Sequence, residues 1–266
     1  MHPIWSPDGK FVAFNRIFQV MRDPPWIVDS LSGMRIIEPT KGSCVDSVIS
    51  FFCIDWFPSG TEILSFTGGV YSLSTHCVHS LLDTSLHYIA ADISPDGRNI
   101  LCVKKNESVD SFMIVMIDTL GFRSKVLFNS GLAPSWHPSG DRLVFIGTLN
   151  NKKHICIGDT NGNIVRLIVP KGGDAIAWGG CGPRFSPDGS KICYSSYQYA
   201  DGGLDDFFIH ICDSLGKNDI ELIDGYQPFW SPDGNKIVFA RYNADEDATS
   251  LWIINSNGSG LKRITY

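Results

Sequence analysis

A tight turn recurs six times along the chain, and its spacing restricts the fold more than any other sequence feature. The six copies are Trp5–Gly9, Trp56–Gly60, Ile93–Gly97, Trp136–Gly140, Phe185–Gly189 and Trp230–Gly234. Their prolines lie 51, 37, 43, 49 and 45 residues apart, and the interval from the last proline through both chain ends to the first is 41 residues. Repeats of this period are typical of solenoids and propellers. The chain therefore contains six whole repeat units.

The turn has a simple stereochemical basis. Proline presets the backbone for the first central position of a type I turn, and Asp or Ser can bond its own backbone at the second. Glycine then accepts the positive φ that follows. Such a turn joins two antiparallel strands, and the large residue ahead of it is expected to pack between neighbouring repeats as core.

Apolar segments rich in β-formers follow each turn and are expected to form the second strand of each repeat. These segments are 11–14, 63–66, 100–103, 143–146, 192–194 and 237–240. Third strands are predicted at Trp26–Val28, 70–73, 112–115, 154–157, 208–211 and 251–254. In most repeats a second polar turn and a fourth strand follow, as at Asp159–Gly162 and Leu261–Ile264.

Short antiparallel strands with almost no helical periodicity predict an all-β fold, a six-bladed β-propeller of four-stranded antiparallel blades. We expect a single propeller domain over residues 1–266, with blades at approximately 1–40, 41–83, 84–128, 129–170, 171–223 and 224–266. Blade one begins with its innermost strand and blade six ends with its outermost. Ring closure is therefore expected to depend on packing between these two blades, without a shared strand.

Composition argues against several classes of function. The net charge of -6 and the pI near 5.6 argue against a nucleic-acid partner. No apolar run reaches the length of about 18 residues that a membrane span needs, so membrane insertion is not expected. Met1–Trp5 lacks the basic start and apolar core of a signal peptide. The eight cysteines include no Cys-x-x-Cys pair, which favours buried free thiols and a cytoplasmic location. If the chain is a trimmed exported protein, the expected location is instead periplasmic.

The repeat resembles a known family. A Pro-x-Trp/Phe-Ser/His-Pro-Asp/Ser-Gly pattern is complete at Pro3, Pro134, Pro183 and Pro228. It is similar to the PD40, or WD40-like, repeat of the TolB propeller domain and of propellers in several peptidases and sugar lyases. The resemblance covers essentially the whole chain and implies the propeller fold. One fold hosts many activities, so it implies less about function.

Strand order divides the predicted disc into two faces. The six repeated turns and the second polar turns lie on one face, and the more variable connections lie on the other, where binding residues usually occur. Segments of blades five and six on this second face are expected to lie side by side. Their candidate binding residues are Tyr197, Tyr199, Asp201, Asp205, Asp206, Tyr242, Asp245, Glu246 and Asp247. Acids and tyrosines suit a basic peptide or a hard cation, although such charge runs are more often solvated loops.

A second candidate site lies at the channel mouth. Asp55, Asp92 and Arg184 each stand immediately before the large residue of a repeated turn, on an innermost strand. Opposed charges near the axis could orient a ligand or the terminus of a partner. They could equally satisfy one another, since structural ion pairs resemble sites.

Other chemical motifs are weak. His76, Cys77, His79 and His87 are the densest group of soft-metal ligands, but strand alternation sends His76 and His79 to opposite faces, so no metal site is predicted. The glycine-rich segment 178–183 lacks the Lys-Ser/Thr pair and following helix of a phosphate loop. The Gly-x-Ser-x-Gly elbow of the peptidase relatives does not occur.

The sequence therefore predicts a binding module rather than an enzyme, with no cofactor. We expect a monomer that presents its loop face or channel mouth to a protein or peptide, as the resemblance to the TolB propeller implies. Two alternatives stay open. One is a metal-dependent lyase or lactonase with its site in the channel, which needs several His or acidic residues on innermost strands. The other is a gating propeller detached from a peptidase.

Overall fold

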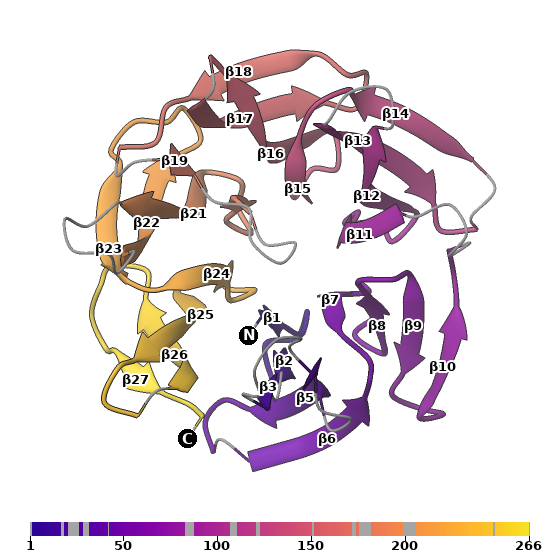
Figure 1. Ribbon diagram of the computed structural model, residues 1–266, viewed down its shortest axis with the longest axis vertical. Helices are drawn as coiled ribbons and strands as arrows, with labels where there is room; N and C mark the ends of the chain where they lie inside the picture. Colours follow the sequence, from indigo (N-terminus) through magenta and orange to yellow (C-terminus); the bar gives the residue numbers. More distant parts are fainter. Residues whose placement is uncertain are drawn as a thin grey trace.

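The computed structural model describes residues 2–16, 19–20, 27–28, 32–41, 43–82, 88–106, 111–120, 123–150, 152–171, 174–175, 182–198, 206–246 and 248–265. The ordered elements in these ranges are all β-strands, arranged as six antiparallel sheets around a central axis (Figure 1). The predicted fold class, a six-bladed β-propeller, is confirmed. No helix in the described part of the chain is long and apolar enough to span a membrane.

The first three blades each contain four strands. Blade one consists of β1 (Pro3–Trp5), β2 (Val12–Arg16), β5 (Gly33–Glu38) and β6 (Ser43–Ile49). Blade two consists of β7 (Cys53–Trp56), β8 (Glu62–Ser65), β9 (Gly69–Ser72) and β10 (Cys77–Ser80). Blade three consists of β11 (Tyr88–Ile93), β12 (Asn99–Asn106), β13 (Ser111–Asp118) and β14 (Ser124–Phe128).

The remaining three blades complete the ring. Blade four consists of β15 (Leu132–Trp136), β16 (Arg142–Leu149), β17 (Lys152–Asp159) and β18 (Ile164–Ile168). Blade five consists of β19 (Asp174–Ala175), β20 (Arg184–Phe185), β21 (Lys191–Gln198), β22 (Asp206–Asp213) and β23 (Ile220–Asp224), and both β19 and β20 pair with β21. Blade six consists of β24 (Tyr226–Trp230), β25 (Lys236–Asn243), β26 (Ala248–Asn255) and β27 (Lys262–Arg263).

The predicted third strand of blade one was wrong. Residues Ile27–Val28 form β4, which pairs with β3 (Gln19–Val20) in a separate two-stranded hairpin. The third strand is β5 instead, paired with β2 over Val12–Arg16. The buried Met34, Ile36 and Ile37 hold β5 in the blade. Strand β6 then pairs with β5, so the sheet of blade one runs past the expected boundary at residue 40.

The six repeated turns have the expected conformation. In each, the glycine N–H donates to the carbonyl oxygen three residues earlier, at 2.8 or 2.9 Å, and the glycine φ lies between 69° and 75°. The first turn shows the side-chain bonds: Ser6 Oγ donates to Asp8 Oδ1 at 2.7 Å and accepts from the Phe11 N–H at 2.9 Å. These bonds fix the connection between the innermost strand and the next.

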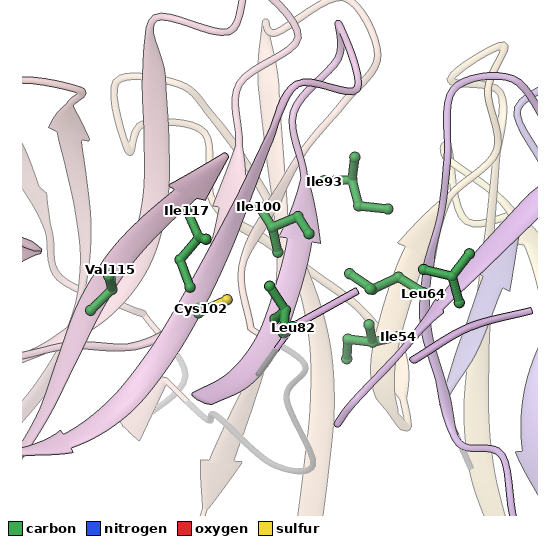
Figure 2. Packing of buried hydrophobic residues seen from close by; sticks show 9 residues of the cluster. Ile54, Leu64, Leu82, Ile93, Ile100, Cys102, Val115 and Ile117 are labelled. Atoms are coloured by element: carbon green, nitrogen blue, oxygen red, sulfur yellow. The ribbon is translucent and has the colours of Figure 1, made fainter. Parts of the chain in front are cut away.

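Six apolar clusters fill the six junctions between blades, as the core prediction required. The junction between blades two and three buries Ile54 and Leu64 against Ile93, Ile100 and other side chains of blade three, and Figure 2 shows the two sets facing one another. The large residue ahead of each turn joins the cluster shared with the preceding blade. These residues are Trp5, Trp56, Ile93, Trp136, Phe185 and Trp230.

The repeated turns also contact one another around the ring. The glycine of each turn lies against the proline of the preceding blade: a Cβ built on Gly60 would stand 3.9 Å from Pro7 Cδ, and one on Gly97 would stand 3.5 Å from Pro58 Cδ. The exception is Gly189, which faces the His137 ring instead of a proline. The turns thus form a continuous ring on one face of the disc, which we call the turn face.

Blades six and one close the ring as expected. Strand β27 pairs with β26, and β1 pairs with β2, so the described strands include none that is shared between the two blades. Closure depends on the cluster that includes Trp5 and Val12 from blade one and Val238 from blade six. On the turn face a Cβ on Gly9 would lie 3.8 Å from Pro232 Cδ. At the rim, the Lys262 ammonium donates to the Thr40 carbonyl at 3.4 Å.

Candidate functional site

One residue from each blade precedes the large core residue on the innermost strand, where it lies near the axis. These six residues are Ile4, Asp55, Asp92, Ser135, Arg184 and Phe229. The structure brings together the three that the sequence singled out, and all three are at most 9% exposed. We call Asp55, Asp92 and Arg184, with the neighbouring His2, the axial cluster.

The two axial carboxylates connect successive blades. Asp55 Oδ1 accepts the N–H of Trp56 in its own blade, and Oδ2 accepts the N–H of Ile93 in blade three, both at 2.9 Å. Asp92 repeats the pattern one blade further, because its Oδ2 accepts the Trp136 N–H at 2.6 Å. Each carboxylate therefore satisfies a buried backbone donor of the following blade, which explains why an acid stands at this position in blades two and three.

Arg184 compensates the charge of the second carboxylate. Its Nη1 lies 2.9 Å from Asp92 Oδ1 and 3.5 Å from Ser135 Oγ. The guanidinium carbon stands 4.4 Å from the centroid of the Phe229 ring. The pair is thus enclosed by side chains of two further blades, so removing either partner would leave the other charge buried and uncompensated.

Burial shifts the pKa values of two other titratable groups of the axial cluster toward the neutral form. Burial, followed by the charge of Asp92, raises the pKa of Asp55 well above its usual range, although Arg184 opposes this shift. Burial, followed by the charge of Arg184, lowers the pKa of His2 to about 3, and its Nε2 lies 3.2 Å from the Ile54 carbonyl oxygen. The axis therefore carries one compensated ion pair, and burial disfavours the charged forms of Asp55 and His2, an arrangement suited to joining blades.

On the opposite face, which we call the loop face, part of the predicted acidic and aromatic patch can be placed. Tyr199, Asp201, Asp205 and Asp247 lie outside the described residues. Tyr197 lies at the end of β21, Asp206 begins β22, and Tyr242 lies near the end of β25, with Asp245 and Glu246 in the connection that follows.

Aromatic side chains cross the junction between blades five and six. The Tyr197 and Phe207 ring centroids are 5.5 Å apart, and those of Phe207 and Tyr226 are 5.6 Å apart. All three rings are half-buried, whereas Tyr242 is 53% exposed. The hydroxyl of Tyr226 lies 2.9 Å from Thr249 Oγ1, which holds that ring in place. Thr249 also pairs with Tyr242 across β25 and β26, and we call Tyr197, Phe207, Tyr226 and Tyr242 the aromatic strip.

Two arginines form ion pairs with acidic side chains near this strip. Arg263 holds Glu246 through two bonds of 2.7 and 2.6 Å, and this partner lowers the pKa of Glu246. Arg241 holds Asp224 in the same way, at 2.6 and 2.8 Å. Bidentate pairs of this kind direct carboxylate oxygens toward the protein. Glu246 therefore offers less charge to a basic partner than the sequence indicated.

A polar network at the junction of blades four and five was not foreseen. His210 lies between Ser196 and Asp219, with Nε2 2.9 Å from Ser196 Oγ and Nδ1 3.2 Å from Asp219 Oδ1. Tyr194 donates to the other oxygen of Asp219 and stacks on His210. The Lys171 N–H, from blade four, also donates to Asp219, at 3.3 Å. The order Ser, His, Asp is that of a catalytic triad.

Burial gives this network a structural role. Ser196 is 0% and His210 1% exposed, so a substrate cannot reach the hydroxyl in this conformation. Burial opposes ionisation of Asp219, but the hydrogen bonds from His210 and Tyr194 outweigh it and lower the pKa of Asp219. No sequence motif pointed to the network, because its members come from separate strands and a turn.

The histidines and cysteine that are close in the sequence around residue 77 do not form a metal-binding group in the described structure. His76 Nδ1 lies 2.9 Å from the Tyr71 hydroxyl and 3.4 Å from Asp46 Oδ2, while Cys77 and His79 lie in β10. His87 lies outside the described residues. Among the residues that the structure describes, no three His, Cys, Asp or Glu side chains are grouped to hold a metal ion.

The fold is that of a TolB-like six-bladed propeller. A putative TolB from Agrobacterium tumefaciens matches with a TM-score of 0.66 and 20% identity, over 84% of this chain and 83% of that one. TolB from Acinetobacter baumannii matches with a TM-score of 0.53 and 18% identity, over 97% of this chain and 52% of that one. The present chain therefore spans about half the length of that protein.

An enzyme shares the same architecture. An oligogalacturonate lyase in complex with manganese matches with a TM-score of 0.60 and 15% identity, over 99% of this chain and 76% of that one. No family model and none of the curated proteins matches the chain. Likeness at these identities shows the fold alone, so the PD40 resemblance stays a prediction.

Proposed function

We propose that this chain is a non-enzymatic binding module that presents its loop face to a protein or peptide. The observation that carries the proposal is the aromatic strip, Tyr197, Phe207, Tyr226 and Tyr242. Three of its rings contact one another across the junction between blades five and six, and the fourth, Tyr242, is 53% exposed. Tyrosines supply contact area with little loss of rotamer freedom on binding, and they are common among the residues that dominate interfaces.

Peptide selection tests the proposal. A displayed library of random 12-residue peptides is selected against the wild type, and binding is measured for Tyr242→Ser combined with Asp245→Asn. The control variant is Leu120→Ser, since Leu120 is 73% exposed in the second polar turn of blade three, on the turn face. We expect the loop-face variant to lose about tenfold or more in affinity, or about 1.4 kcal/mol, and the control to bind like wild type. Equal binding by all three proteins would refute the proposal.

The alternative is a lyase or lactonase with its site at the axis, and the contacts of the axial cluster weigh against it. Asp55 and Asp92 already accept backbone donors, and Asp92 is paired with Arg184. Elemental analysis of protein purified without chelator, together with an assay for unsaturated products from oligogalacturonate, separates the two. A stoichiometric metal with lyase turnover would establish the enzyme.

A further inference from the structure

Charged side chains on the loop face are paired near blades five and six but exposed on blade four. Near blades five and six, Asp224 and Glu246 are held by bidentate arginines. In blade four, Lys152 and Lys153 begin β17, directly after the connection from β16, and both are exposed. Within the described ranges neither ammonium group has a hydrogen-bond or ion-pair partner. Blade four therefore presents two exposed ammonium groups without a partner in the described ranges, in a protein of net charge -6.

Strand alternation places the two lysines over different junctions. Cys156 packs in the cluster between blades three and four, so Lys152, four residues earlier in β17, lies on that side of the strand. Ile155 packs in the cluster between blades four and five, which puts Lys153 on the other side. The loop-face end of blade four thus has one ammonium group above each of its two junctions.

Blade three adds an aromatic ring and a further lysine on the side facing Lys152. Phe112 lies two residues before Ile114, which belongs to the same junction cluster, and it is 36% exposed. Lys105 pairs with Phe112 across β12 and β13. We call Lys105, Phe112, Lys152 and Lys153 the basic sector (strands β12, β13 and β17 in Figure 1).

A buried histidine lies beneath the basic sector. His154 is 9% exposed and shares the Lys152 side of β17, since it lies two residues along the strand. Its Nδ1 has no hydrogen-bond partner among the described residues. Buried polar atoms are normally paired, so this nitrogen, on the Lys152 side of β17, is a second observation, independent of the lysines, of a polar group left unpaired within the described residues.

We infer that the basic sector docks an extended acidic peptide segment whose carboxylates contact Lys152 and Lys153 and whose apolar side chains cover Phe112. This inference rests on the proposed binding function and specifies the charge of the partner. An extended chain repeats its side chains on one side every two residues, about 6.6 Å apart, which suits a row of contacts that runs from the exposed ring on blade three to the two ammonium groups on blade four. Three lysines are few for nucleic-acid binding, which needs many phosphate contacts.

Fluorescence anisotropy with synthetic peptides tests the inference. The probe is a labelled eight-residue peptide, Glu-Ser-Val-Ser-Glu-Ser-Val-Ser, which places its Glu and Val side chains on one side of an extended chain, and the comparison peptides replace Glu by Gln or by Lys. The test variant combines Lys152→Glu with Lys153→Glu. The control combines Lys217→Glu with Lys236→Glu, which makes the same charge change at exposed positions near the turn face.

We expect the Glu peptide to bind wild type and control within about twofold, and the test variant to bind at least about tenfold more weakly. Affinity should fall as salt rises from 50 to 300 mM, because exposed charges are screened over about 10 Å or less. Equal binding of the Glu peptide to the test and control variants would overturn the inference. So would binding of oligogalacturonate at this sector without binding of the Glu peptide.

The outcome also separates this inference from the proposed function. If peptides selected in the library bind through Tyr242 and are unaffected by Lys152→Glu with Lys153→Glu, the acidic-segment inference fails and the binding function stands. If no peptide of any charge binds the wild type, both fail.

Discussion

Replacing Trp5 by alanine tests how the ring is closed. Trp5 lies in the cluster between blades six and one and Trp136 in the cluster between blades three and four, at 7% and 6% exposure. Neither indole N–H has a hydrogen-bond partner within the described residues, so both side chains contribute through packing alone. If closure uses the same packing as every other junction, the two truncations should cost the same.

The expected magnitude follows from burial. A tryptophan buries roughly 200 Å², and about 25 cal/mol per Å² gives about 5 kcal/mol, of which alanine retains a small part. Truncations of buried aromatic residues typically cost about 3–5 kcal/mol. Trp230→Ala should cost about 1 kcal/mol more, because Trp230 Nε1 also donates to the Arg184 carbonyl at 3.2 Å.

Urea unfolding followed by far-UV circular dichroism measures these differences. We expect the midpoints of Trp5→Ala and Trp136→Ala to coincide, with unchanged slopes, and that of Trp230→Ala to be lower. A loss below about 1 kcal/mol for Trp5→Ala, beside a loss of about 4 kcal/mol for Trp136→Ala, would show that the ring does not depend on its closing junction. The equivalence of the six junctions would then be wrong.

Three further predictions concern charge and thiols. Arg184→Met should lower the free energy of unfolding by about 3–5 kcal/mol, because it leaves the Asp92 carboxylate buried without its cation. A urea double-mutant cycle with Asp92→Asn should show a coupling energy of at least about 1 kcal/mol, and additive effects of the two substitutions would contradict the pairing. A hydrogen bond from Ser186 is the main cause that lowers the Asp188 pKa to about 2. Because this folded-state pKa is depressed, the ionised Asp188 stabilises the fold above about pH 4, and this stabilisation is lost toward about pH 2. Between about pH 4 and pH 2 the urea midpoint of Asp188→Asn should therefore fall less than that of wild type. Iodoacetamide should label Cys44 and Cys77, the exposed cysteines among the seven described, in a peptide map of native protein, and labelling of a buried thiol would contradict the packing.

The turns made most of the fold predictable from sequence. The residues ahead of each Pro-Asp-Gly or Pro-Ser-Gly mark the innermost strand, and the meander that follows leaves little choice of strand order. Blade one was the exception, because Ile27–Val28 and Gly33–Glu38 are both short β-rich segments and only the pairing of Val12–Arg16 decides between them.

The candidate site was predictable only in part. Asp55, Asp92 and Arg184 were found because their position repeats relative to the turn, and the repeat brings that position to the axis in every blade. The pairing of Glu246 with Arg263 could not be foreseen, because it depends on where β27 places a side chain beside a neighbouring loop. The Ser196, His210 and Asp219 network has the same origin in tertiary structure alone.

The ring of turn contacts has a geometric consequence. Six repeats that close on themselves must rotate by about 60° each on average, whereas an open solenoid can absorb any deviation by changing its curvature. A junction that differs, such as the one where Gly189 faces His137 in place of a proline, must have its angular error cancelled by the other five. Closure therefore makes the orientation of each blade a property of the whole circle, and a substitution that widens one junction should tilt blades on the far side of the axis.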